Sequence, residues 1–568
     1  MNKKKGQLLK LKDILFSAKS SRQNISNYWQ SEFIENPFFN DIYITVDLIF
    51  GNGKVLRMAT NRIEVKDGNN FIGYMPFLAS EPEISSSYEL LSGDGSQRSI
   101  QITIDGRAVE AAEILSSGNF IAGVGEICLQ KHNGDYSQRL ILLRGTISGG
   151  VTFGKREEPV SLSLSDAVIS NDLIIPQFFI TKEDFPSMAD DEHGKRLPVI
   201  LGSFDAGVPC TCIRITQNDY GPQYLIAYGW HYNVESVFIE KTEVESTDVE
   251  RGWSVVRDTT GSGIPYSYLD FVFPQSVYDD PNTDEEGSLK GLWREGSVAI
   301  FAKVYSSDNS FSNSSALTQM QILLTDYTGF GSEGFDWELF GRTQSKDPGL
   351  KIQTLINGSD QDNTTTSIEY VQNTFTDSFP MLSLIYSRTG IGIVFTDRHA
   401  PVIFGSYISG QSGLIDRLSL VTETPSEEVY NSFTMKYNYS TVDDTYQSLL
   451  VIDHTNNALC AISNTKLGLR EYEIIESVTI YDHTTANYVL NWLAAHLSLP
   501  RYVVEYSVEP SLFLQLRVGD NIKITDSELK WNNVTATITS IVYVKTNMKV
   551  TLNVWALYNQ IENISGVS

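Results

Sequence analysis

The sequence predicts a mainly β, multidomain protein with a minor α+β part and with barrel-like β domains near the two ends of the chain. The length of 568 residues exceeds what one hydrophobic core holds, so about three or four domains are expected. A hydrophobic fraction of 41% suffices for folded cores and argues against disorder. Short runs of alternating apolar and polar residues, separated by Gly, Asn and Asp, are typical of antiparallel strands.

The sequence predicts a polar arm with one possible helix at residues 1–35 and the first barrel-like domain at residues 36–185. Apolar residues alternate from Ile42 to Phe50, and Gly51-Asn52-Gly53 supplies a turn before a return strand at 54–60. The same alternation predicts further strands at 100–104, 126–130, 140–143 and 160–164. Several short strands separated by turn signals indicate a barrel or a sandwich.

Residues 186–330 predict an inserted β-rich domain with a long acidic loop region. Residues 197–202 and 223–227 resemble strands, whereas 233–290 is rich in Asp and Glu. A calcium site is one interpretation of the acidic run at 279–286. This run lacks the glycine and the terminal glutamate of an EF-hand loop, so a solvated acidic loop is the better interpretation.

Residues 331–417 predict a small α+β domain. Asp347-Pro348 is typical of a helix start, and it precedes apolar residues at helical spacing between Leu350 and Ile356. A second short helix is predicted at 382–385. The remaining apolar runs predict strands at 391–395 and 402–404.

Residues 418–568 predict the second barrel-like domain, with one helix. Phe433 to Tyr439 alternate as in a strand, and Asp482 can cap a helix that runs to about Ser498, before Pro500. The other predicted strands are 502–508, 512–516, 521–525, 534–538 and 550–554. One helix over about five or six antiparallel strands indicates a closed or nearly closed barrel.

The segment 516–525 predicts a half-buried antiparallel hairpin that turns at Gly519-Asp520. It contains no nucleophile, metal cluster or phosphate loop. We therefore interpret this segment as a building element and expect the function to come from the architecture.

We identify no catalytic, cofactor-binding or metal-binding residues in the sequence. Gly410-Gln411-Ser412-Gly413 departs from G-x-S-x-G, and Gly53-Lys54 lacks the upstream glycine of a P-loop. Asp191-Glu192-His193 beside Lys195-Arg196 is an acid/base candidate, for which a solvated loop is the better interpretation. His496 is interpreted as a boundary residue of its helix. Paired carboxylates for glycoside hydrolysis stay open, because their separation is spatial.

We predict that the four cysteines are buried thiols. They are Cys128, Cys210, Cys212 and Cys460. Only Cys210 and Cys212 are close in sequence, and a C-x-C pair without further ligands nearby is not a zinc module. Free cysteine commonly behaves as a small hydrophobe, so no metal or redox role is expected.

The charge balance excludes one class of function. The chain has 69 acidic and 43 basic residues, a formal net charge of −26. Because this charge repels a phosphate backbone, it argues against tight non-specific DNA binding. The basic N-terminal start lacks the apolar run of a secretory signal, and no stretch of about 18 apolar residues occurs. We expect a soluble protein made in a cytoplasm.

Several segments, taken in their order, resemble the tail hub or baseplate hub proteins of tailed bacteriophages. Gly93 to Ile104, Leu140 to Ile147 and Pro159 to Leu164 look like the opening domain of those proteins, and Tyr224 to Glu243 is similar to a later stretch. The helix before Pro500, together with Leu516-Arg517-Val518-Gly519-Asp520, looks like their closing domain. The resemblance covers most of the chain after residue 36 and lies in hydrophobic pattern and motif order.

The resemblance implies a non-enzymatic structural protein of the virion, at the distal tip of a phage tail. It implies a homotrimeric ring that adapts a hexameric tail tube to a three-fold tip and lets DNA pass during ejection without specific binding. The implied partners are a distal tail or tube protein, tip or fibre proteins and the tape measure, with possible host envelope contact. The protein would be made in the host bacterial cytoplasm.

Two other functions remain open from the sequence. A tail-tip protein that binds host glycans would use exposed aromatic residues such as Trp230, Trp253 and Trp293, although burial is the common fate of tryptophan. A cell-wall hydrolase is the third class. For the hub, we hypothesise that acidic side chains face a lumen through which DNA slides.

Overall fold

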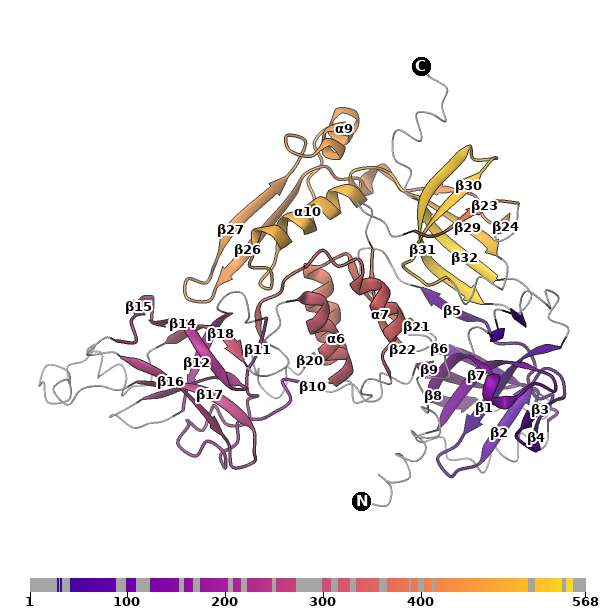
Figure 1. Cartoon of the computed structure of the whole chain (residues 1–568), viewed down its shortest axis with the longest axis horizontal. Helices are drawn as coiled ribbons and strands as arrows, with labels where there is room; N and C mark the ends of the chain where they lie inside the picture. The colour runs from indigo at the N-terminus through magenta and orange to yellow at the C-terminus, as the bar shows by residue number, and fades with distance from the viewer. Residues whose placement is uncertain are drawn as a thin grey trace, which may run out of the picture.

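The computed structural model is built mainly of β-sheets, with a small helical centre (Figure 1). It describes residues 28–29, 31–32, 41–87, 99–108, 123–152, 158–166, 174–202, 208–215, 222–247, 252–271, 299–307, 315–326, 334–356, 365–387, 390–396, 403–410, 414–508, 516–543 and 548–554. Two curled half-barrel sheets lie toward the two ends of the chain, which confirms the predicted fold class. The acidic run at 279–286 lies outside the described residues.

The first half-barrel is a six-stranded antiparallel sheet in the order β2-β1-β7-β8-β9-β6. Its strands are β1 (Ile42–Ile49), β2 (Val55–Ala59), β6 (Ser99–Ile104), β7 (Val124–Lys131), β8 (Leu140–Thr152) and β9 (Val160–Asp166). Ile49 pairs with Val55, so the hairpin predicted at 42–60 is confirmed. The strands predicted at 126–130 and 140–143 pair with each other, as Cys128 with Ile141. Alternate residues of β1 point into the core, where Ile44, Val46 and Leu48 are fully buried and each contributes about 1.5–3 kcal/mol.

The opposite face of the first sheet carries buried charge beneath the hairpin of β3 (Ile63–Asp67) and β4 (Asn70–Tyr74). Asp47 lies opposite Glu126 in the ladder. Glu126 is bound by Arg139 at 3.0 Å and by Arg144 at 2.7 Å, and Tyr136 donates a hydrogen bond to Asp47 at 2.9 Å. Both buried carboxylates are therefore paired with basic or hydroxyl side chains, as is usual for buried polar groups that stabilise a fold.

A seven-stranded antiparallel sheet follows, in the order β15-β14-β18-β12-β13-β17-β16. Its strands are β12 (Val208–Arg214), β13 (Gln223–Tyr228), β14 (His231–Ile239), β15 (Thr242–Val244), β16 (Trp253–Thr259), β17 (Pro265–Phe271) and β18 (Ile300–Ser307). Cys210 and Cys212 lie two residues apart on β12 and both point into the core of this sheet. The predicted strand at 223–227 is confirmed as β13.

The helical centre contains α6 (Ala316–Asp326), α7 (Trp337–Gln344), α8 (Ser367–Tyr370) and the π-helix η6 (Val371–Thr376). Two short strand pairs surround it. They are β10 (Ile174–Ile175) with β20 (Thr365–Thr366), and β11 (Val199–Leu201) with β19 (Thr354–Ile356).

The helix predicted after Asp347-Pro348 is wrong. The Asp347 carboxylate accepts hydrogen bonds from the N–H groups of Gly349 and Leu350, at 2.9 and 3.1 Å, and so closes a turn. Gly349 has φ +87°, a left-handed conformation that interrupts a helix. The chain continues into strand β19.

The helix predicted at 382–385 is also wrong, because this segment is β21 (Leu382–Ser387), paired with β22 (Gly390–Phe395). The β21–β22 hairpin is buried on both faces. Leu382 and Leu384 enter the helical core, whereas Ile385 enters the core of the half-barrels. Strands buried on both faces show continuous apolar runs, which periodicity alone does not separate from a buried helix.

The second half-barrel has the order β23-β30-β31-β32-β29-β24. Its strands are β23 (Ile403–Ile408), β24 (Leu414–Arg417), β29 (Tyr502–Val508), β30 (Asn521–Asp526), β31 (Trp531–Tyr543) and β32 (Met548–Val554). The short strand β25 (Thr422–Glu423) pairs with β29, and β5 (Ile84–Ser87) of the N-terminal part pairs with the end of β31. A strand from one end of the chain thus completes the half-barrel at the other end.

The predicted helix at 482–498 is confirmed as α10 (His483–Leu497), with Asp482 as its N-cap. It does not cover the half-barrel, as the sequence had suggested. It packs on a separate sheet of β26 (Phe433–Ser440), β27 (Thr445–Ile452) and β28 (Ile475–Glu476), next to α9 (Ala458–Leu467). The β23–β30 pairing is parallel, so the half-barrel is not purely antiparallel.

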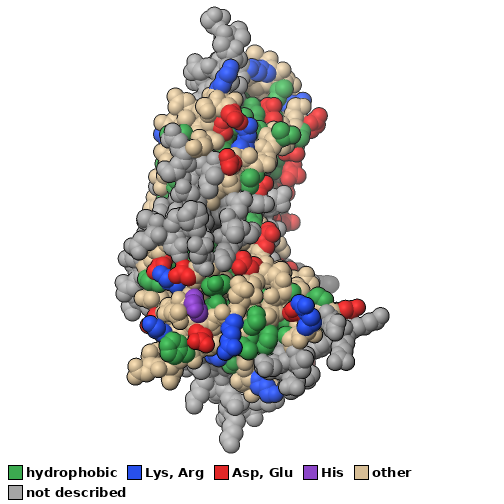
Figure 2. Space-filling view, turned by 90° about the vertical axis from the view of Figure 1, so that its right-hand side faces the viewer, with side chains coloured by type: hydrophobic (Ala, Val, Ile, Leu, Met, Phe, Trp, Pro, Cys, Tyr) green, Lys and Arg blue, Asp and Glu red, His purple; other side chains and the backbone are tan. Residues whose placement is uncertain are grey.

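One hydrophobic core joins the two half-barrels. It contains Ile44 of β1 and Ile538 of β31, together with Leu339 of α7 and Val394 of β22. Figure 2 shows the side of the molecule that these sheets form, with acidic, basic and apolar side chains interspersed and with Asp and Glu gathered along one edge of the upper part. The helical centre therefore supports both half-barrels through a shared interior.

Candidate functional site

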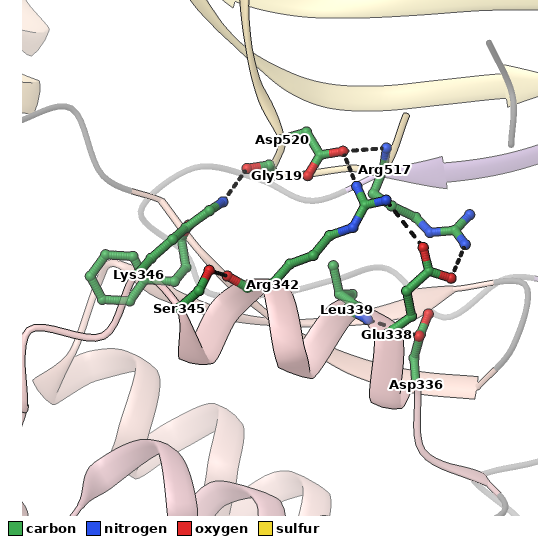
Figure 3. A network of polar contacts seen from close by, with 10 residues as sticks. Asp336, Glu338, Leu339, Arg342, Ser345, Lys346, Arg517, Gly519 and Asp520 are labelled. Atoms are coloured by element: carbon green, nitrogen blue, oxygen red, sulfur yellow. Dashed lines mark hydrogen bonds and ion pairs between the residues drawn. The ribbon is translucent and has the colours of Figure 1, made fainter. Parts of the chain in front are cut away.

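The turn that the sequence analysis singled out is bound to helix α7 by a network of polar contacts (Figure 3). We call this network the junction and define it by Glu338, Arg342 and Lys346 on the α7 side and by Arg517, Gly519 and Asp520 on the turn. The turn leads directly into β30 of the second half-barrel. The junction therefore joins the helical centre to that sheet.

Asp520 is the centre of the junction. Its carboxylate is 1% exposed and accepts hydrogen bonds from Arg342 Nη1 at 2.7 Å and from the backbone N–H of Arg517 at 2.8 Å. Charge-assisted hydrogen bonds of this kind are about twice as strong as neutral ones. The contact to Arg517 closes the turn, and the contact to Arg342 ties the turn to α7.

Glu338 links the two arginines from the first turn of α7. Its two carboxylate oxygens accept from Arg342 Nη2 at 3.1 Å and from Arg517 Nη2 at 3.0 Å. Lys346 extends the network, since its ammonium lies 3.4 Å from the carbonyl oxygens of Phe395 and Gly519. The two carboxylates thus bind the two arginines, and Lys346 binds backbone carbonyls next to them.

Helix α7 is held in place by its N-cap. Asp336 accepts a hydrogen bond from the Leu339 N–H at 3.0 Å, and its second carboxylate oxygen accepts from the Ser387 hydroxyl of β21. Asp336 is 2% exposed, so these partners satisfy a buried charge. The cap fixes the start of α7 relative to the β21–β22 hairpin.

Gly519 lets the turn approach β22 closely. Its φ is +85°, and a Cβ atom at this position would lie 2.0 Å from Val394 Cγ1. Only glycine meets both conditions without strain. The close packing of Gly519 on Val394 and the polar contacts of Asp520 therefore both hold the turn in this position.

Burial is the largest influence on the Asp520 carboxyl and raises its pKa above the ordinary value. Arg342, Lys346 and the Arg517 N–H act in the opposite direction. Removing a carboxylate from water disfavours its charged form, whereas cations and donors nearby favour it.

A small cavity of about 40 Å³ lies beside the junction. Its lining comes from five parts of the chain. They are Ile84 to Ser86 of β5, Leu142 of β8, Ile385 and Ser387 of β21, Leu516 to Val518 of the turn, and Ile541 of β31. Ser86 donates a hydrogen bond to the Tyr386 carbonyl at 3.1 Å. The cavity is too small for a typical ligand, whose pockets measure about 300 Å³ or more.

The predicted burial of the four cysteines is confirmed, because Cys128, Cys210, Cys212 and Cys460 are all buried. The interpretation of His496 as a boundary residue is wrong. His496 is fully buried, its ring stacks on Trp492 with centroids 3.8 Å apart, and its Nδ1 lies 2.7 Å from the Trp492 carbonyl.

The acid/base candidate at 191–196 lies in a turn-rich loop. Glu192 pairs with Lys195 at 3.0 Å, and His193 Nε2 lies 2.9 Å from the Phe185 carbonyl. Arg196 departs from the expected solvated loop, since it is 8% exposed, binds the Pro176 carbonyl at 2.7 Å and lies over the Phe179 ring. These contacts hold the loop in shape.

Of the three tryptophans named for glycan binding, Trp230 is 39% exposed and donates from its Nε1 to the Asp258 carbonyl. Trp253 is half-buried and donates to the Val244 carbonyl at 2.8 Å. Trp293 lies outside the described residues, as do Gln411, Ser412 and Gly413.

Across the described ranges, no group of three or more His, Cys, Asp or Glu side chains is arranged to hold a metal ion. No helix in those ranges is long and apolar enough to cross a membrane. The junction itself consists of ion pairs and hydrogen bonds between packed elements. Its chemistry is that of a structural connection.

The sequence analysis found the turn but missed its partners on α7. One signal was available, because Asp336 stands at an N-cap position and Glu338 and Arg342 have the i, i+4 spacing of a helical ion pair. The pairing with Asp520 had no local signal.

Comparison with known proteins gives likeness only among solved structures. The chain is similar to a tail protein from Neisseria meningitidis MC58, with a TM-score of 0.37, 9% identity, and coverage of 90% of this chain and 96% of that chain. It is similar to a chain in the virion of a native gene transfer agent particle, with a TM-score of 0.38, 10% identity, and coverage of 68% and 90%. A prophage tail protein from Listeria monocytogenes EGD-e matches with a TM-score of 0.25, 10% identity, and coverage of 65% and 99%.

Further matches, with TM-scores of 0.18, are to structures of a P2 virion baseplate. No family model matches the sequence, and no curated protein matches it.

Proposed function

We propose that the protein is a structural subunit of a phage virion, a tail hub at the distal end of the tail tube. Three copies form a ring that adapts a hexameric tube to a three-fold tip. The role is structural rather than catalytic. The protein is made in the host bacterial cytoplasm and is incorporated at the tail tip.

The observation that carries this proposal is the arrangement of two half-barrel sheets in one chain around a shared core. Three copies of a chain with two such sheets present six β units, which matches a six-fold ring on one side and three-fold symmetry on the other. In a cyclic assembly the contacts are heterologous and close the ring, and exposed sheet edges are covered by neighbours.

The domain organisation is part of the proposal. We propose an arm at 1–35, a first barrel-like hub domain at 36–185, an inserted acidic domain at 186–330, a small α+β domain at 331–417 and the C-terminal hub domain after 418. Two features refine these limits. Strands β23 and β24, which precede residue 418, belong to the C-terminal sheet, where they pair with β30 and β29. Strand β5 of the first domain also pairs with this sheet, through β31.

The proposed partners are other tail proteins, namely the distal tail or tube protein, tip or fibre proteins and the tape measure. Phage DNA passes through the ring without specific binding. The formal charge of −26 supports this, because acidic walls repel the phosphate backbone. Contact with the host envelope follows from the position at the tip.

A glycan-binding tip protein is the second candidate, and the exposed ring of Trp230 is the observation that favours it. An exposed indole can stack on the face of a sugar ring. The half-burial of Trp253 removes one of the aromatic groups on which this candidate relied. A glycan array with the full chain tests it, and Trp230→Ala is the matched variant.

Antibody labelling of virions tests the hub proposal. Antibodies raised against the chain should label the distal end of the tail in electron micrographs, with at most one cluster per particle. Label on the head, or along the whole tail tube, would contradict a hub. A peptidoglycan zymogram of the same purified chain addresses the hydrolase, and we expect no clearing.

A further inference from the structure

The small sheet of β26, β27 and β28 is covered on one face and open on the other, as far as the described residues go. Phe433, Met435 and Tyr437 of β26 pack against α10 in the helical core. Side chains alternate between the two faces of a strand, so Thr434 and Lys436 point away from α10. We call the side without α10 the outer face.

The outer face carries apolar side chains around one ion pair. Leu449 of β27 is 62% exposed on this face, and Ile474 and Val478, which flank β28 in sequence, are 55% and 50% exposed. Leu449 and Glu476 pair with Lys436 from opposite sides in the ladder, and Lys436 Nζ contacts Glu476 Oε1 at 2.7 Å. Single exposed apolar residues are normal on a surface, whereas several on one sheet face mark a binding site.

The edge of the outer face at β28 is acidic, because Glu476 lies on it and two further glutamates precede it in sequence. Glu471 and Glu473 are exposed along the segment that leads into the edge strand β28, next to Ile474. A partner that fits this face presents apolar side chains together with positive charge.

The N-terminal arm of this chain has that chemistry. Residues 1–27 hold seven of the 43 basic residues and one of the 69 acidic residues, a formal +6 in a chain whose total is −26. Leu9 and Leu11 alternate with Lys10 and Lys12. An extended segment with this pattern presents leucines on one side and lysines on the other.

The later part of the arm, after residue 27, is fixed to the first half-barrel. Trp29 is fully buried in the shared core, and its Nε1 donates to the Gln138 carbonyl at 2.6 Å, while Glu32 binds Lys131 at 2.7 Å. In Figure 1 the first half-barrel and the β26–β27 hairpin lie at opposite corners of the molecule, with the helical centre between them. Within one copy, the arm would have to pass around the helical centre to reach the outer face.

We infer that the arm of one copy binds the outer face of the β26–β28 sheet on a neighbouring copy. An extended arm of 27 residues spans about 90 Å, enough to reach across a contact between copies. The interaction is heterologous, so repeating it around a cyclic assembly closes a ring of arms. It rests on charge and exposed surface and does not depend on a position in a phage tail.

Cross-linking of two full-length variants tests the inference. Leu9→Cys and Ile474→Cys are purified separately, mixed, and treated with a short bismaleimide; the four native thiols are buried. We expect covalent dimers in the mixture at five-fold or more the yield of a control mixture of Leu9→Cys with Leu420→Cys. Leu420 is 89% exposed on the second half-barrel and so matches Ile474 in chemistry but not in place.

Charge reversal provides the second part of the test. Lys10→Glu with Lys12→Glu in the Leu9→Cys chain should lower the yield by at least five-fold, and raising the salt should lower it as well. Equal yields with Ile474→Cys and Leu420→Cys overturn the inference. So does a Leu9→Cys, Ile474→Cys double variant that closes only within one chain, since the arm then binds its own copy.

Discussion

Arg342 of α7 and Asp520 of the turn before β30 form an ion pair of 2.7 Å across 178 residues of sequence. The Asp520 side chain is almost fully buried, and Arg342 is one-fifth exposed. The Arg342 guanidinium also lies 4.8 Å from the Phe404 ring centroid at the edge of the second half-barrel. This pair is the polar link by which the helical centre holds that sheet.

Asp520→Ala should destabilise the second half-barrel by about 2–3 kcal/mol, because it leaves Arg342 and the Arg517 N–H without their acceptor. Hydrogen exchange of the β30 and β31 amides measures the loss. Asp105→Ala is the control, since Asp105 pairs with Arg107 two residues away at the surface, and we expect no change in β30 there. Equal protection in both variants would show that the pair is not part of the support.

The pH dependence of stability should carry the signature of Asp520. Its pKa is raised in the folded state, mainly by burial, so the folded protein binds this proton more readily than the unfolded chain. The resulting stabilisation is fully present below the unfolded pKa and is lost as the pH rises through the folded pKa. The stability of the native chain relative to Asp520→Asn should therefore increase from pH 7 to pH 4. A decrease over this range means that the arginines outweigh burial.

Gly519→Ala should cost about 2–4 kcal/mol, because a left-handed conformation is unfavourable for alanine and the new methyl overlaps Val394. Gly263→Ala is a matched control, since Gly263 also has φ +85° but has open space around its Cβ position. We expect about 1 kcal/mol for the control. Thermal unfolding compares the two, and similar shifts would mean that the contact with Val394 relaxes at no cost.

The pairing of β5, from the N-terminal part of the chain, with β31 of the second half-barrel gives a prediction for both half-barrels. Ile84 is 4% exposed in the shared core and pairs with Tyr543. Ile84→Ala should cost about 2–4 kcal/mol and should raise hydrogen exchange in both half-barrels. Phe71→Ala, at a side chain that is 61% exposed, should change neither. Loss of protection confined to β5 and β31 would show that the two sheets unfold independently.

Local patterns in the sequence predicted what local forces determine. The alternation in β1 and β26 and the Asp482 cap of α10 were sufficient for these elements. The strand β21 was mistaken for a helix, because a strand buried on both faces has no alternation. The turn after α7 depends on Gly349, whose left-handed conformation outweighs the apolar spacing that follows.

The junction was beyond local patterns for a different reason. Asp520 and Arg342 meet only after the chain has folded, and β5 reaches β31 from more than 450 positions away. The turn itself was recognisable from Gly519-Asp520. Its contacts with α7 depend on the shared core, because packing in that core sets the distance between the helical centre and the second half-barrel.

The mass of the purified full-length chain in solution, measured by native mass spectrometry over a wide range of concentration, tests the hub most directly. The proposal predicts a closed species of three 63.5 kDa chains, and three-fold particles in electron micrographs of the same sample. A chain that stays monomeric at the highest concentration, or that closes as a two-fold dimer, would contradict it.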